Sequence, residues 1–81
     1  MRLDKYLKVT RIIKRRTVAN EACDAAHVTV NGRPAKASYD VKIGDRIDVT
    51  FGARTLSIRV VEVKDTVGKD AASTLYEVID S

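Results

Sequence analysis

The fold is decided by the stretch TVANEACDAAHVTVNG, residues 17–32, where a helical repeat gives way to an alternating one. Small apolar residues recur at helical spacing behind Thr17, a favourable N-cap, which predicts a helix from Thr17 to Ala26. Residues 28–30 then predict a strand, closed by Asn31-Gly32, the strongest short-range signal for a type I′ hairpin. The apolar side of the helix is expected to consist of Val18, Ala19, Ala22, Cys23 and Ala26.

The segment before this helix predicts a shorter helix and a turn. Leu3, Tyr6 and Leu7 recur at i, i+3 and i+4, as on one side of an amphipathic helix, and basic residues at 2, 5 and 8 form a neighbouring stripe. Residues 11–16 have no clear period, so they predict a connecting turn. Arg15 and Arg16 would then lie just before the second helix, where amide groups and the helix dipole favour a phosphate.

The segment after the hairpin predicts further strands. Pro34 cannot donate to a ladder, so the returning strand is expected at a sheet edge. Gly44-Asp45 and residues 52–54 predict turns on either side of an alternating strand whose apolar residues are Ile47, Val49 and Phe51.

The last strands and loops follow from the same alternation. Residues 56–60 predict a strand, and a slip in its phase predicts a bulge near Val60-Val61. Residues 64–73 predict an exposed loop and residues 76–78 a final strand. We therefore expect a small α+β domain in which two N-terminal helices pack on a small, mostly antiparallel sheet.

The size and composition of the chain limit what it can be. Its 81 residues predict a single domain, 1–81, with a thin core. No apolar run approaches the roughly 18 residues of a membrane span, and the charged N-terminus is unlike a signal peptide, so we expect a cytoplasmic protein. A single cysteine, Cys23, excludes an internal disulfide, and with only His27 nearby it cannot build a zinc site. We expect Cys23 to be a small buried residue.

The charges are separated along the chain. Residues 1–36 hold nine Lys and Arg against three Asp and Glu, while residues 37–81 hold six against eight. Such a basic pole attracts and orients a polyanion, so the pattern favours nucleic acid over a merely solvated surface.

The motifs of enzymes are absent from the sequence. It has no Gly-rich phosphate loop, no Ser-His-Asp set and no cluster of metal ligands, so we expect no catalytic residue, metal or cofactor. Asp45 and Asp48 are expected to be solvated surface residues, and His27 to be structural.

Six short segments, taken in order, carry a resemblance to a known family. They are RLDKYL at 2–7, Arg11, KRRT at 14–17, VTVNG at 28–32, KAS at 36–38 and Gly44-Asp45. In this order and spacing the chain resembles the S-four (alpha-L) RNA-binding domain over about residues 1–50. The resemblance implies one L-shaped surface of two helices and a hairpin that cradles folded RNA, with residues 51–81 as a β extension.

Over its whole length the chain is similar to the stand-alone members of this family that act in bacterial ribosome quality control. Residues 3–9, 11–17, 35–38, 49–52 and 64–66 carry this likeness. It implies binding to the rRNA and tRNA of large ribosomal subunits obstructed by peptidyl-tRNA, and work with an RqcH-type partner that adds alanine tails. The protein is then ribosome-associated, monomeric off the ribosome and without a membrane partner. The expected RNA-binding residues are Arg2, Lys5, Lys8, Arg11, Lys14, Arg15, Arg16, Lys36 and Ser38.

Three other interpretations stay open. The small heat-shock protein of the same fold also binds obstructed large subunits. A helix-turn-helix DNA-binding protein shares the short helices and positive charge, but the helix from Thr17 to Ala26 lacks residues that read base edges. A β-grasp sulfur carrier acts through a C-terminal Gly-Gly, whereas residues 79–81 are Ile-Asp-Ser. The chain also departs from the family at Ala26-His27, where a Gly commonly ends the second helix, which puts the cap geometry in question.

Overall fold

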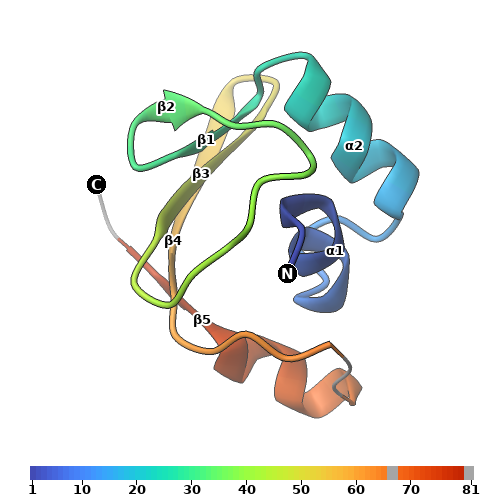
Figure 1. Ribbon diagram of the computed structural model, residues 1–81, viewed down its shortest axis with the longest axis vertical. Coiled ribbons are helices and arrows are strands. Elements are labelled where there is room, and N and C mark those ends of the chain that lie inside the picture. The colour runs from blue at the N-terminus through green and yellow to red at the C-terminus, as the bar shows by residue number, and fades with distance from the viewer. Residues whose placement is uncertain (66–67, 80–81) are drawn as a thin grey trace.

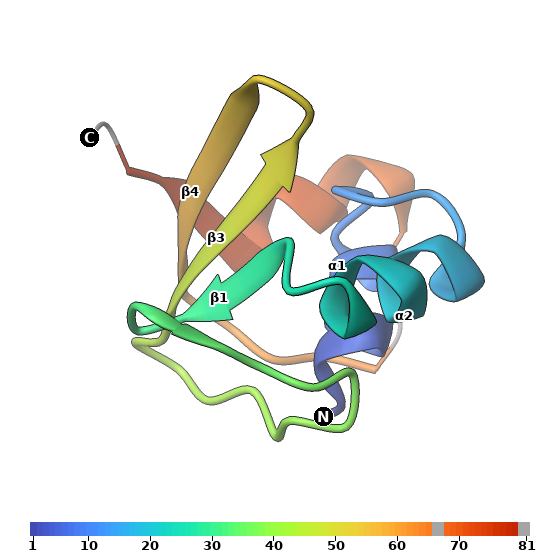
Figure 2. The same ribbon diagram turned by 90° about the horizontal axis from the view of Figure 1, so that it is seen from above.

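The computed structural model describes residues 1–65 and 68–79, which form two helices and a five-stranded sheet (Figure 1). The strands follow the order β2-β1-β3-β4-β5, and every neighbouring pair is antiparallel. In Figure 2 the helices lie along one side of the sheet, so the expected α+β class is confirmed. Within these residues no helix is long and apolar enough to cross a membrane. The elements are α1 (Leu3–Val9), α2 (Arg16–Asp24), β1 (Val28–Val30), β2 (Arg33–Pro34), β3 (Arg46–Phe51), β4 (Arg54–Val60), the 3-10 helix η1 (Lys69–Leu75) and β5 (Tyr76–Val78).

The core lies between the helices and the sheet. Helix α1 contributes Leu3, Tyr6 and Leu7, all fully buried, as its i, i+3, i+4 spacing predicts. The Tyr6 hydroxyl donates to the carbonyl of Leu75 over 2.8 Å, which joins the first helix to η1. The sheet contributes alternate residues of its three central strands, the largest being Val28, Ile47, Val49, Ile58 and Val60.

The predicted apolar side and N-cap of helix α2 are confirmed only in part. Cys23 is buried, as expected, and burial raises the pKa of its thiol to about 11. Val18 and Ala26 are exposed, so the apolar side is narrower than predicted. The prediction of Thr17 as N-cap is wrong, because the carbonyl of Arg15 accepts from the Ala19 amide at 3.0 Å and Arg15 is therefore the cap.

The end of α2 resolves the question raised by Ala26. Ala26 adopts the left-handed conformation, with φ of 61°. Its amide donates to Cys23 over 3.0 Å, and the next amide, of His27, donates to Ala22 over 2.9 Å. These two bonds are the Schellman pattern that usually contains Gly, so the cap forms here despite the steric cost of a Cβ.

The sheet follows the sequence prediction except at its far end. Asn31 and Gly32 have φ of 54° and 83°, as a type I′ hairpin requires, and Pro34 lies in the edge strand β2. Phe51 is 46% exposed instead of buried like Ile47 and Val49, because the β3–β4 hairpin extends beyond the helices (Figure 2). Near the predicted bulge, the amides of Val61 and Glu62 both donate to the carbonyl of Leu75, the two-against-one pattern of a bulge.

The predicted loop 64–73 is mostly exposed where its side chains are described, but part of it is helical, and the expected exposure of Asp45 is wrong. Of the predicted loop 64–73, residues 69–73 belong to η1, and residues 66–67 lie outside the described residues. Ala72 and Leu75 are buried, three residues apart, which matches the three-residue turn of a 3-10 helix. Asp45 is also buried, because the turn before it folds back and lets its carboxylate accept from the Lys42 amide at 3.0 Å. Asp48 is half-buried and accepts from Arg46 at 3.3 Å.

Candidate nucleic-acid interface

A buried carboxylate holds two arginines at the junction of α1 and α2. Asp4 is only 2% exposed and lies in the first turn of α1. Its Oδ1 accepts from Arg2 Nε and its Oδ2 from Arg16 Nε, each at 3.2 Å, and the Lys5 amide donates to Oδ1 at 2.8 Å. Both arginine side chains stay about half exposed. The carboxylate therefore fixes the inner edge of each guanidinium and leaves part of each group open to solvent.

Asp4 remains ionised in this setting. Desolvation by burial raises its pKa, but the hydrogen bonds from Arg16, Arg2 and the Lys5 amide outweigh it, so the pKa lies below the ordinary value of 3.8. Two positive groups thus share one negative charge, so the cluster of Asp4 with Arg2 and Arg16 keeps an excess positive charge at neutral pH, although Glu21 and Asp24 line the neighbouring hollows. That excess can attract a phosphate, since guanidinium groups hold phosphate oxygens through paired N–H donors.

The loop after β2 is docked beside this arginine pair. The amide of Leu3 donates to the carbonyl of Tyr39 at 2.8 Å, and the amide of Asp4 donates to that of Ala37 at 3.2 Å. The N-terminal ammonium forms an ion pair with Asp40 at 2.7 Å. These bonds carry Lys36 and Ser38 close to Arg2, although they are more than thirty residues away in the sequence.

A groove runs from the arginine pair to this loop. One hollow is lined by Arg2, Arg16 and Asn20, among others, and a second by Arg2, Asn20, Lys36 and Ser38 with part of α2. Because the two hollows share Arg2 and Asn20, we treat them as one helix-side groove. Four of the nine predicted RNA-binding residues meet in it: Arg2, Arg16, Lys36 and Ser38.

The other five predicted residues do not line the groove. The Lys5 ammonium lies 3.3 Å from Asp65, on a segment that follows β4. Lys8 lies in the last turn of α1, and Arg11, with φ of 62°, follows the Thr10 cap of that helix. Lys14 and Arg15 occupy the connection to α2, and among the side chains that the structure describes none is an ion-pair partner of these four. They form a separate, exposed basic group whose contact with RNA stays a prediction.

Sequence reasoning missed two residues that organise the groove. Asp4 was counted only as an acid that opposes the basic pole, yet it holds both arginines. Asn20 reaches the same carboxylate, with Nδ2 3.5 Å from Oδ2. The spacing of Arg16 and Asn20, four apart on one helix, is a signal that could have placed them on a shared face.

Comparison with known proteins identifies the family to which this chain belongs. The sequence profile of the S4 domain matches residues 1–47, more than half of the chain. The chain belongs to the S4 domain family. A protein of Halalkalibacterium halodurans named RQC P-site tRNA stabilizing factor is 54% identical over 78 residues, covering 96% of this chain and 89% of its own. The protein of that name from Bacillus subtilis is 49% identical over 98% of this chain and 92% of its own.

A solved structure shares both the fold and a detectable sequence likeness with this S4 protein. The trimeric structure of Vibrio cholerae Heat Shock Protein 15 superposes with a TM-score of 0.91 at 32% identity, covering 98% of this chain and 81% of the other. The Heat shock protein 15 homolog of Haemophilus influenzae is 29% identical, and this chain spans 63% of its length.

Proposed function

We propose that this S4 protein binds RNA through the helix-side groove and stabilises P-site tRNA on obstructed large ribosomal subunits. The observation that carries the proposal is the arginine pair that Asp4 holds half exposed at the head of the groove. Two relatives about half identical to it are named for P-site tRNA stabilisation, which supports the tRNA as the ligand. The proposal extends to a ribosome-associated, cytoplasmic protein that is monomeric off the ribosome.

We infer that the protein acts passively, by holding RNA in place. The relatives are named as stabilizing factors, and the described residues contain no group of three or more potential metal ligands. The best-placed nucleophile, Cys23, is buried with a raised pKa, so its thiol is protonated at neutral pH. An RqcH-type partner would supply the chemistry of alanine tailing, and this chain would keep the tRNA in position for it.

The first test measures binding to large subunits. Arg16→Ala is expected to weaken cosedimentation with subunits that carry peptidyl-tRNA, because it removes a charge-assisted contact that contributes about 1–3 kcal/mol. Arg54→Ala is the matched control, since Arg54 lies exposed where β4 begins, on the hairpin that extends beyond the helices (Figure 2). Thermal denaturation checks that both variants are folded. If the two folded variants bind equally well, the groove is not the RNA site.

A second candidate function is recycling of obstructed subunits in the manner of the heat-shock relatives. The TM-score of 0.91 to Heat Shock Protein 15 favours it, and subunit binding alone does not separate the two. Deletion of the gene separates them, because only the quality-control role predicts shorter alanine tails on a stalled reporter. Unchanged tails would favour the recycling role and leave RNA binding in place.

A further inference from the structure

A third hollow is lined by the same loop that borders the helix-side groove. Its volume is about 720 Å³, within the range of roughly 300–1,000 Å³ that small-molecule sites occupy. We call it the hairpin hollow, and its polar and aromatic lining consists of Asn31, Arg33, Lys36, Ser38 and Tyr39. Lys36 and Ser38 also line the helix-side groove, so residues 36–38 form a ridge between the two.

The tyrosine in this hollow is held in one orientation. The Tyr39 hydroxyl donates to Asp45 Oδ2 over 2.8 Å. Asp45 is itself fixed, because Asn31 Nδ2 donates to Oδ1 over 3.1 Å and the Lys42 amide to Oδ2 over 3.0 Å. Tyr39 is only half-buried, so part of its side chain stays accessible. The ring packs partly against the core and is fixed at its hydroxyl, so its accessible part can serve as a stacking surface that needs little further ordering when a ligand binds.

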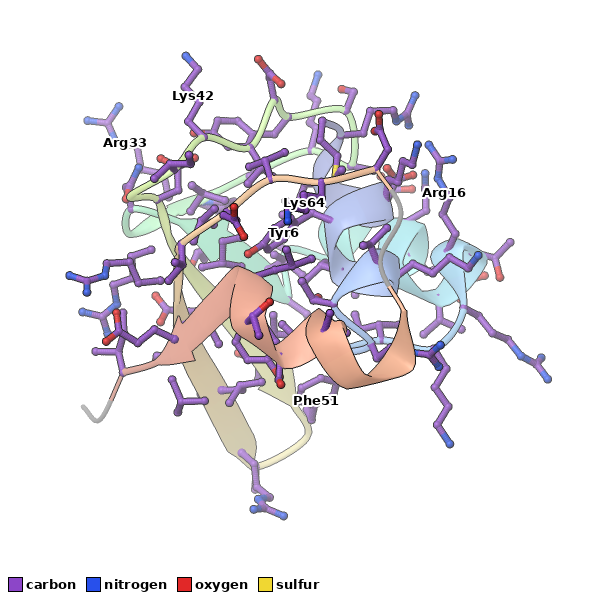
Figure 3. All side chains as sticks on the ribbon, turned by 90° about the horizontal axis from the view of Figure 1, so that it is seen from below. Tyr6, Arg16, Arg33, Lys42, Phe51 and Lys64 are labelled. Atoms are coloured by element: carbon purple, nitrogen blue, oxygen red, sulfur yellow. The ribbon has the colours of Figure 1, made fainter. Side chains whose placement is uncertain are left out.

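The cations around the hollow are available for a phosphate. Arg33 and Lys36 are exposed, and among the described residues neither has a carboxylate within ion-pair distance. The nearby acids are already engaged, since Asp40 pairs with the N-terminal ammonium and Asp45 is buried in its hydrogen bonds. Figure 3 shows Arg33 and Lys42 projecting from the same end of the molecule, away from Arg16. The hollow therefore combines an aromatic platform with a local positive field.

We propose that the hairpin hollow receives an unpaired nucleotide of the bound RNA, with its base on Tyr39 and its phosphate on Arg33 or Lys36. The proposal rests on the proposed RNA-binding function and deepens it. Bases stack on exposed aromatic rings whatever their sequence, and a flanking cation that tracks the backbone is the usual companion of such a platform. An RNA held at Arg2 and Arg16 reaches the hollow across the ridge, because both surfaces include Lys36 and Ser38.

The test uses two RNA hairpins that differ in one nucleotide. One carries a single bulged 2-aminopurine, whose fluorescence falls when it stacks, and the other is fully paired. The whole protein is expected to quench the bulged probe and to bind it more tightly than the paired one. Tyr39→Leu removes the ring and is expected to lose about 5- to 150-fold in affinity for the bulged probe alone. Tyr39→Phe keeps the ring and gives up the bond to Asp45, so it is expected to retain most of the preference.

The predicted contact of Arg33 with the phosphate is tested by a matched pair of variants. Arg33→Gln is expected to lower the slope of log affinity against log salt by about 1, whereas Arg54→Gln at the far end of the sheet leaves it unchanged. If Tyr39→Leu fails to fold, a photoreactive 4-thiouridine at the bulge replaces it, and cross-links in the unmodified protein should map to residues 31–39.

The outcomes separate this inference from the function it rests on. Equal affinity for both probes with no quenching, or cross-links only at α1 and α2, would overturn the hairpin hollow while leaving RNA binding by the groove intact. Failure to bind either probe would overturn the proposed function itself.

Discussion

Replacing Asp4 by asparagine separates the positioning of the arginine pair from its charge. Asn keeps the shape of the side chain and can still accept from the Lys5 amide, but it removes the negative charge that Arg2 and Arg16 share. Breaking a buried ion pair from one side costs about 3–5 kcal/mol. Here the stranded partners are half exposed and regain water, so we expect a smaller loss, about 1–3 kcal/mol, in the free energy of unfolding.

The effect on RNA affinity has two parts of opposite sign. Removing a negative charge near a phosphate strengthens attraction by about 1 kcal/mol in a half-solvated site, and salt reduces this gain. Releasing two arginine side chains costs about 0.5–1.5 kcal/mol each, because they must be ordered again on binding. The second part is larger, so we expect Asp4→Asn to lose about 1 kcal/mol, which is about fivefold in Kd.

The sign of the change in RNA affinity tests whether Asp4 positions the arginines. A second variant gives the effect of removing a negative charge alone. Glu21 lines the same groove and is exposed, and in the described part of the chain its carboxylate holds no arginine. Glu21→Gln therefore removes the same charge without releasing a side chain, and it is expected to bind slightly more tightly. Fluorescence anisotropy with a labelled RNA hairpin at several salt concentrations measures both variants. If Asp4→Asn also binds more tightly than the parent, the carboxylate does not position the arginines and the reasoning fails.

Three further predictions concern stability. Ala26→Gly is expected to raise the free energy of unfolding by up to about 1 kcal/mol, because it removes the steric strain of an alanine in the left-handed conformation. Ala25→Gly, at φ of −84°, is the control and is expected to lower that free energy. Thermal denaturation of both variants checks this. The pKa of Asp45 is lowered, since hydrogen bonds from Lys42, Tyr39 and Asn31 outweigh desolvation. The stabilisation by its carboxylate is therefore present above the ordinary pKa of 3.8 and disappears as pH falls through the lower folded value. Asp45→Asn should flatten the acid limb of a plot of unfolding free energy against pH, and an unchanged limb would contradict this. Tyr6→Phe is expected to lower the free energy of unfolding by about 1 kcal/mol. This is toward the low end for a buried hydrogen bond, because the Leu75 carbonyl keeps two amide donors. Urea denaturation measures the loss, and a value near zero would show that the bond contributes nothing.

Local patterns in the sequence predict most of the fold. The i, i+3, i+4 spacing at Leu3 and the Asn31-Gly32 turn each depend on neighbours a few residues away, and the structure confirms both. The errors arise where distant segments decide the outcome. Phe51 alternates like a core residue, but it is 46% exposed at the end of β3, on the hairpin that extends beyond the helices. The segment of η1 predicts a loop because it has few large apolar residues, and the core that receives Leu75 includes Tyr6, nearly seventy positions earlier.

The candidate site shows the same division. Charge counting finds the basic half of the chain, because charges add without regard to geometry. It does not find which cations converge, since that depends on the loop from 36 to 40 docking on the N-terminus of α1. Nor does it find Asp4, because a formal count subtracts an acid from a basic site even where that acid fixes the site's shape.

The same few bonds position both proposed RNA surfaces. The amides of Leu3 and Asp4 bind the carbonyls of Tyr39 and Ala37, and the side chain of Asp4 then holds Arg2 and Arg16. The ridge at 36–38, the arginine pair and the Tyr39 platform are therefore fixed relative to one another by the first turn of α1. A rigid arrangement of this kind suits a protein that holds folded RNA without breaking a bond, because ordering completed during folding does not have to be supplied again by the RNA.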